Sequence, residues 1–99
     1  MNLLYQIKRS PYISRDLEHI LPIAREGSHV MLFQDAVLAA AVTQENREWL
    51  QVLADAGVTV HALSEDLSAR GVRDVLPGID VVDYGGWVDL VERFQPVSC

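Results

Sequence analysis

The sequence predicts a three-layer α/β fold, in which helices flank a mainly parallel sheet of four to five strands. Short apolar runs alternate with segments of helical periodicity over the whole length, and this order is typical of parallel βαβ units. The runs at 3–7 and 29–33 lack a clean alternation of apolar and polar residues, as expected of strands covered on both faces. No linker, repeat or low-complexity segment interrupts the sequence, so residues 1–99 are expected to form a single domain.

A strand and an amphipathic helix are expected first. The apolar run at 3–7 predicts a buried strand that leads into a turn. The helix is indicated by apolar residues at i, i+3, i+4 and i+7, namely Leu17, Ile20, Leu21 and Ala24. Ser14 or Asp16 is available as its N-cap, and Gly27 follows its end. Pro22 has no amide hydrogen and should kink or shorten this helix.

The middle of the chain predicts a second strand followed by two helices. Residues 29–33 form the apolar run of the strand. Asp35 would cap a short helix of small apolar residues that reaches Ala41. A longer helix should run from about 44 to 56 and end at Gly57. Its inward-facing residues are expected to be Leu50, Leu53 and Ala54.

Two further strands and two further helices complete the expected fold. Residues 58–63 are rich in β-branched side chains and predict the third strand. Ser64 would cap the next helix, which Arg70 and Gly71 would end. Residues 79–82 predict the fourth strand. The last helix has apolar residues at helical spacing, namely Trp87, Leu90, Val91 and Phe94.

The two ends of the last helix also carry local signals. The pair Gly85-Gly86 suits a tight entry into the helix, and Pro96 should stop it. The tail at 97–99 is expected either to add a short edge strand or to stay frayed.

Composition limits the classes of function. The formal net charge is −6, from 14 acidic and 8 basic residues, which disfavours direct binding to nucleic acid. Hydrophobic residues make up 49% of the chain and charged residues 22%, more apolar side chain than so small a core readily hides. We therefore expect a subunit that buries surface against partners. The N-terminus lacks a charged segment followed by a long apolar run, and the longest uncharged stretch is too short to span a bilayer, so a cytoplasmic protein is expected.

Cys99 is the single cysteine and the last residue. One cysteine excludes an internal disulfide and any Cys-x-x-Cys motif. Sulfur transfer would require a thiolate, and the α-carboxylate of the same residue, in an acidic protein, disfavours that state. Cys99 is therefore expected to be incidental, with a functional thiol as the alternative.

The other candidate side chains have structural interpretations. Asp35 follows a strand at the sheet edge where open α/β folds bind ligands, but N-capping is the favoured role, and Asp66 and Asp83 are treated in the same way. The histidines His19, His29 and His61 lack metal-ligand spacing, although His29 and His61 could be neighbours across adjacent strands. No phosphate-binding or dinucleotide-binding glycine motif is present, so no cofactor is expected. Trp49 and Trp87 are assigned to the core, with an interface as the alternative.

Several segments carry a resemblance to one family. Residues 62–72 and 82–91, together with Ser10-Pro11-Tyr12 and 32–37, resemble the TusB/DsrH subunits of bacterial sulfur-relay complexes. The resemblance implies a DsrE-like fold and a place in a heterohexamer with two copies each of three related subunits, the partners being TusC-like and TusD-like. In the TusB branch such a complex passes sulfur between carrier proteins for 2-thiolation of the tRNA wobble uridine. In the DsrH branch a similar assembly serves sulfur oxidation.

One departure from the family favours the TusB branch. Many DsrH-type sequences have a cysteine in the first helix, and the corresponding residue here is Ile20. The resemblance then places the sulfur-accepting cysteine on the TusD-like partner. The first hypothesis is a non-catalytic subunit of a sulfurtransferase complex. The alternatives are a sulfurtransferase that uses Cys99, and a regulatory or ligand-binding domain that uses the sheet edge near Asp35.

Overall fold

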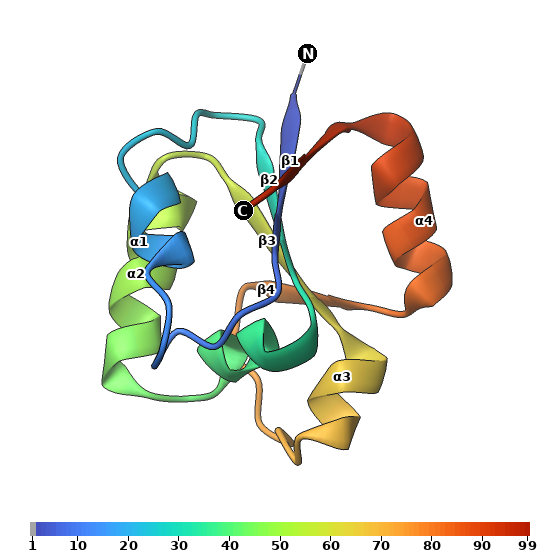
Figure 1. The fold of residues 1–99 in the computed structure, drawn as a ribbon. Coiled ribbons are helices and arrows are strands. Elements are labelled where there is room, and N and C mark those ends of the chain that lie inside the picture. Colours follow the sequence, from blue (N-terminus) through green and yellow to red (C-terminus); the bar gives the residue numbers. More distant parts are fainter. Residues whose placement is uncertain (1) are drawn as a thin grey trace.

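The computed structural model describes residues 2–99 and contains one five-stranded sheet (Figure 1). The strands are β1 (Leu3–Ile7), β2 (His29–Leu32), β3 (Thr59–Leu63), β4 (Ile79–Val82) and β5 (Gln95–Ser98). They lie in the order β4-β3-β2-β1-β5, and all four neighbouring pairs are parallel. The predicted α/β class and mainly parallel sheet are confirmed.

Helices lie on both sides of the sheet. The helical elements are α1 (Asp16–Ile20), the 3₁₀ helix η1 (Gln34–Ala40), α2 (Gln44–Asp55), α3 (Ser64–Ala69) and α4 (Tyr84–Arg93). Figure 1 shows α1 and α2 on one side of the sheet and α4 on the other. The chain steps from β1 to β4 in one direction and returns to place β5 beside β1. Because parallel crossovers are right-handed, the reversed step puts α4 on the opposite face. Within residues 2–99, no helix is long and apolar enough to cross a membrane.

The two faces of the sheet differ in the size of their cores. The face under α1, η1, α2 and α3 buries the larger cluster, which includes Ile7, Leu32 and Leu53. The face under α4 buries a smaller cluster. The members of that cluster are Leu4, Met31, Leu63 and Leu90, with Trp87 and Phe94 packed against them. Most of α4 therefore remains exposed, and Leu90 is its only buried residue.

The first helix is shorter than its apolar spacing predicts. It ends at Ile20 instead of reaching Ala24. Pro22 explains the early end, because a proline ring inside a helix clashes with the carbonyl one turn earlier. The expected caps are also wrong: the N-cap residue is Arg15, which makes no capping hydrogen bond with its side chain. Asp16 is instead bonded to the Arg9 guanidinium, at 3.0 Å between Oδ2 and Nε.

Two other predicted caps are wrong for a common reason. The helix after β2 begins at Gln34 and is a 3₁₀ helix, so Asp35 lies in its first turn and not at its N-cap. α3 begins at Ser64 directly after β3, and the N-cap position falls on Leu63. These connections are too short for the polar residue to occupy the capping position. On α2, Ala54 is exposed, and the buried positions are Asn46, Trp49 and Leu53.

The remaining boundaries agree with the sequence to within one residue: β2 ends at Leu32 and β3 begins at Thr59. β1 and β4 have the predicted bounds, and α2 ends one residue before the predicted limit. The tail is ordered as an edge strand, with Val97 in register with Tyr5 of β1. α4 stops at Arg93, and Pro96 lies within β5, where an edge strand tolerates a residue without an amide hydrogen.

Candidate functional site

The carboxyl edge of the sheet holds an ion-pair cluster between η1 and α3. Arg70 Nε donates to Asp35 Oδ1 at 2.8 Å, and Arg70 Nη1 donates to Asp66 Oδ1 at 3.5 Å. Asp66 Oδ2 also accepts the backbone N–H of Gln34 at 2.6 Å. Gln34 has a φ of +49°, a conformation that is unfavourable for a residue with a side chain and is stabilised by this bond. Asp35 and Asp66 therefore both take part in the contacts that join η1 to α3.

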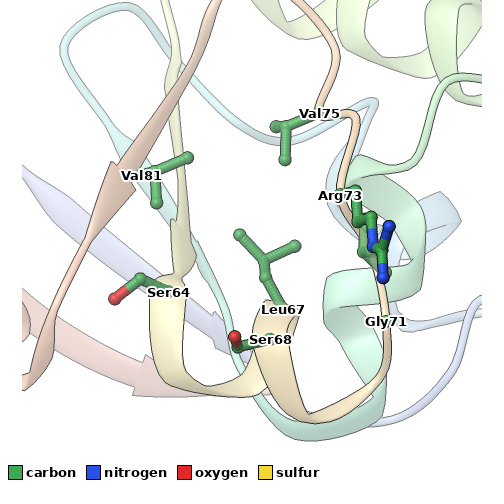
Figure 2. Close-up of a pocket in the computed structure, with 8 residues that line it drawn as sticks. Ser64, Leu67, Ser68, Gly71, Arg73, Val75 and Val81 are labelled. Atoms are coloured by element: carbon green, nitrogen blue, oxygen red, sulfur yellow. The ribbon is translucent and has the colours of Figure 1, made fainter.

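A hollow of about 570 Å³ lies beside this cluster, between α3, β4 and the segment that joins them (Figure 2). Figure 2 shows Leu67, Val75 and Val81 pointing into it. Ser64, Ser68, Gly71, Val72 and Arg73 complete its lining. Asp35 does not line the hollow. The Asp35 carboxylate is bonded to Arg70 instead.

Asp83 and the glycines after it shape the start of α4. Asp83 is the N-cap, and its Oδ1 accepts the backbone N–H of Gly86 at 2.8 Å. A Cβ at Gly86 would lie 3.0 Å from the Cβ of Val82, so a larger residue would crowd the end of β4. The predicted capping role of Asp83 and the tight entry are both confirmed.

Cys99 extends the edge strand and lies half-buried beside α1. Its backbone N–H donates to the carbonyl of Gln6. It shares a hollow of about 250 Å³ with Tyr5, Asp16, His19, Ile20 and Ile23. Burial, and then the charge of Asp16, raise the pKa of the Cys99 thiol above its usual value. The site therefore favours the thiol over the nucleophilic thiolate.

Three side chains form a hydrogen-bonded chain across β4, β3 and β2 on the α4 side. Asp80 Oδ2 lies 2.7 Å from His61 Nδ1, and His61 Nε2 lies 2.8 Å from His29 Nδ1. In the neutral tautomer of His61 that donates its Nδ1–H to the carboxylate, Nε2 accepts the N–H of His29 Nδ1. His29 also stacks on Phe94, with ring centroids 4.0 Å apart. The prediction that His29 and His61 are neighbours across adjacent strands is confirmed. No sequence pattern pointed to Asp80 as their partner.

This arrangement orients side chains and does not gather metal ligands. The two ring nitrogens of His61 face different partners, so the three groups do not converge on one ion. Within residues 2–99, no cluster of three or more His, Cys, Asp or Glu side chains is arranged to hold a metal.

The free energy of unfolding should fall as the pH drops below the ordinary histidine pKa. Burial, then the neighbouring His61 and Arg93, lower the pKa of His29 from 6.5. The unfolded chain therefore binds this proton more readily than the folded protein, so stability is greatest above pH 6.5 and is lost as the pH falls through the lowered value. Urea unfolding at pH values from about 7.5 to about 5.5, roughly one unit on each side of the ordinary histidine pKa, would measure how the free energy of unfolding changes with pH. His29→Phe keeps an aromatic ring against Phe94 and should make this change smaller. An unchanged pH dependence would contradict the role given to His29.

The two tryptophans hold helices in place. The Trp87 indole N–H donates to Gln6 Oε1 at 3.0 Å, which ties α4 to β1. The Trp49 indole N–H donates to Asn46 Oδ1 at 3.0 Å. Trp49 is buried, as predicted, and Trp87 is partly buried at the edge of the smaller core.

Large apolar side chains are also exposed over much of the surface. They are Tyr12, Ile13, Ile23, Val42, Val52, Val81, Tyr84, Val88 and Val91. Three of them, Tyr84, Val88 and Val91, follow helical spacing on the outer side of α4. Ile13 is 80% exposed in the turn before α1. A contiguous exposed apolar stripe, such as Tyr84, Val88 and Val91 on α4, is typical of surfaces that contact other proteins.

Sequence comparisons cover nearly the whole fold. A family model described as DsrH like protein matches residues 9–97, which include every helix described above. The proteins named Protein TusB of Photorhabdus laumondii and Shigella flexneri are each 36% identical over 92 residues, covering 92% of this chain and 93% of the relative. Protein TusB of Escherichia coli strain K12 is 35% identical with the same coverage.

Solved structures agree with the fold at lower sequence identity. The ychN protein of E. coli superposes with a TM-score of 0.79 at 15% identity, over 100% of both chains. The protein MTH1491 of Methanobacterium thermoautotrophicum, described as of unknown function, gives a TM-score of 0.77 at 23% identity, over 99% of this chain and 98% of that one. These similarities concern the fold alone.

Proposed function

The chain belongs to the TusB/DsrH family, and we propose that it is a non-catalytic subunit of a sulfur-relay complex. In this proposal it assembles in the cytoplasm with TusC-like and TusD-like subunits as a heterohexamer. The complex passes persulfide sulfur between carrier proteins, and the sulfur ends in the 2-thiolation of the tRNA wobble uridine. The chain supplies surface that holds the thiol-bearing subunits in register.

The observation that carries this proposal is the environment of Cys99. It is the only cysteine of the chain, it is half-buried, and its pKa is raised by burial and by Asp16. A thiol that accepts and donates sulfur needs the opposite environment, one that lowers its pKa and leaves it accessible. The reactive cysteine of the complex is therefore assigned to a partner subunit.

The exposed apolar residues support an assembling subunit. They lie in the turn before α1, on α2, at β4 and on α4, so more than one side of the chain offers apolar surface to a neighbour. A subunit that contacts two different partners needs two such surfaces.

Light scattering behind size exclusion would test the assembly. The mass is measured for this chain alone and after co-expression with the TusC-like and TusD-like proteins of the same organism. A stable complex that contains all three chains supports the proposal. A well-folded monomer that binds neither partner would count against it.

Cys99→Ser should leave tRNA thiolation by the assembled complex unchanged. The substitution removes the sulfur atom and keeps a side chain of similar size in the hollow beside Ile20. The measurement is the 2-thiouridine content of tRNA in a deletion strain complemented with either form of the chain. If the serine form fails to restore thiolation while it still assembles, this chain is itself a sulfurtransferase.

The same deletion strain distinguishes tRNA thiolation from sulfur oxidation. Loss of the gene should remove most wobble 2-thiouridine, because the relay cannot proceed without the assembled complex. Normal 2-thiouridine together with defective oxidation of stored sulfur would instead assign the chain to the DsrH-type process. The 36% identity to proteins named TusB is the reason for preferring thiolation.

A further inference from the structure

A groove of about 450 Å³ runs between α1 and α2, on the side of the sheet opposite α4. Its apolar lining is formed by Pro11, Leu17, Leu21, Trp49 and Val52. Val52 is 48% exposed, so the floor of the groove is open to a binding partner. Tyr12 and Ile13, both exposed, adjoin its end at Pro11.

The groove follows from the unequal lengths of its two helices. α2 has 12 residues and α1 has 5, which correspond to about 18 Å and about 8 Å at the α-helical rise. Pro22 prevents α1 from continuing along α2. The uncovered part of α2 therefore leaves Val52 facing solvent beside the buried Trp49.

The charged residues that line the groove are all acidic. They are Glu18 on α1 and Glu45 and Glu48 on α2. Arg15 pairs with Glu18 at 3.6 Å, but both side chains are highly exposed, and such a pair contributes little. Among residues 2–99, the Glu48 carboxylate accepts a hydrogen bond from the side chain of Gln44, at 3.5 Å. These three glutamates form the rim of the groove, which therefore presents negative charge beside an apolar floor.

We infer that this groove binds an amphipathic helix of a partner subunit, with apolar residues on the floor and Lys or Arg against the glutamates. An apolar groove is a common receptor for one face of a helix, and the rim selects a basic partner by charge complementarity. A second copy of this chain is disfavoured because each copy carries a net charge of −6. The inference rests on the proposed function and names the surface through which one partner is held.

Charge reversal on the rim tests the inference. Glu45→Lys combined with Glu48→Lys should weaken association with the co-expressed TusC-like and TusD-like subunits by about tenfold or more, because like charges then meet across the interface. Glu26→Lys combined with Asp74→Lys is the matched control: it makes the same change of charge at two exposed residues that neither line the groove nor lie on α4, and it should leave association unchanged. Thermal unfolding of each isolated variant shows whether it folds.

A second variant probes the floor without changing charge. Val52→Asn replaces a half-exposed side chain and should also weaken association. If both the double glutamate variant and Val52→Asn assemble as well as the unmodified chain, the groove inference is wrong but the proposed function stands. Failure of the unmodified chain to assemble overturns both. If the unmodified chain forms a homodimer that Val52→Asn dissociates, the occupant is a second copy and the inference is wrong.

Discussion

Asn46→Ala should lower the free energy of unfolding by about 2–3 kcal/mol, because it removes three hydrogen bonds of a buried side chain. The Asn46 amide nitrogen donates to the carbonyls of Leu38 at 3.1 Å and Ala41 at 2.9 Å, and its oxygen accepts from Trp49. Alanine leaves these groups without partners in the interior. A domain of this size should lose roughly 10–20 °C in Tm.

The network around Asn46 is also what positions the groove. It joins the end of η1 to the first turn of α2 and fixes the indole of Trp49. Gln51→Ala is the matched control, because Gln51 is an exposed amide on the same helix that donates to the exposed Asp55, at 2.7 Å. It should change stability by less than about 0.5 kcal/mol. If calorimetry gave the same fall in Tm for Asn46→Ala and Gln51→Ala, the hydrogen bonds of Asn46 would contribute no more to stability than an exposed amide pair.

The strands could be predicted because their signal is local. The run at 79–82 is bounded by Pro77-Gly78 before it and by the capping Asp83 after it, and β4 occupies those four residues. β4 is an edge strand with Asp80 and Val81 exposed, so the flanking turn residues mark it more clearly than an apolar run does. β1 at 3–7 is an inner strand covered on both faces, and its apolar run predicts it.

The partners of polar side chains could not be predicted, because they depend on register and packing. Asp35 lies where a helix cap is expected, but its partner Arg70 is 35 residues further along the chain. Asp80 meets His61 because these two residues are paired across β3 and β4, and nothing local in either strand fixes that pairing. Asn46 looks like an ordinary polar residue in a helix until η1 is placed against it. Sequence patterns specify which face is buried but not which polar groups meet there.

Leu53→Ala should be among the most destabilising single substitutions in the chain, at about 3–4 kcal/mol, because it leaves a cavity in a packed core. Leu53 is fully buried under α2, at 0% exposure, in the larger core cluster. Its neighbour Val52 is 48% exposed and points to the groove, so Val52→Asn should reduce stability by less than about 1 kcal/mol. Urea unfolding of both variants gives the comparison.

The two substitutions should affect assembly differently if one face of α2 packs in the core and the other contacts a partner. Leu53→Ala should leave assembly unchanged, and Val52→Asn should weaken it. Leu53→Ala removes core packing and leaves the groove lining in place, so the folded fraction should still bind its partners. Val52→Asn keeps the core and changes the surface that the partner contacts. Binding measured well below both unfolding transitions separates the two. If Leu53→Ala abolishes assembly while still folded, or if Val52→Asn unfolds the chain, the two roles are not carried by separate faces of α2.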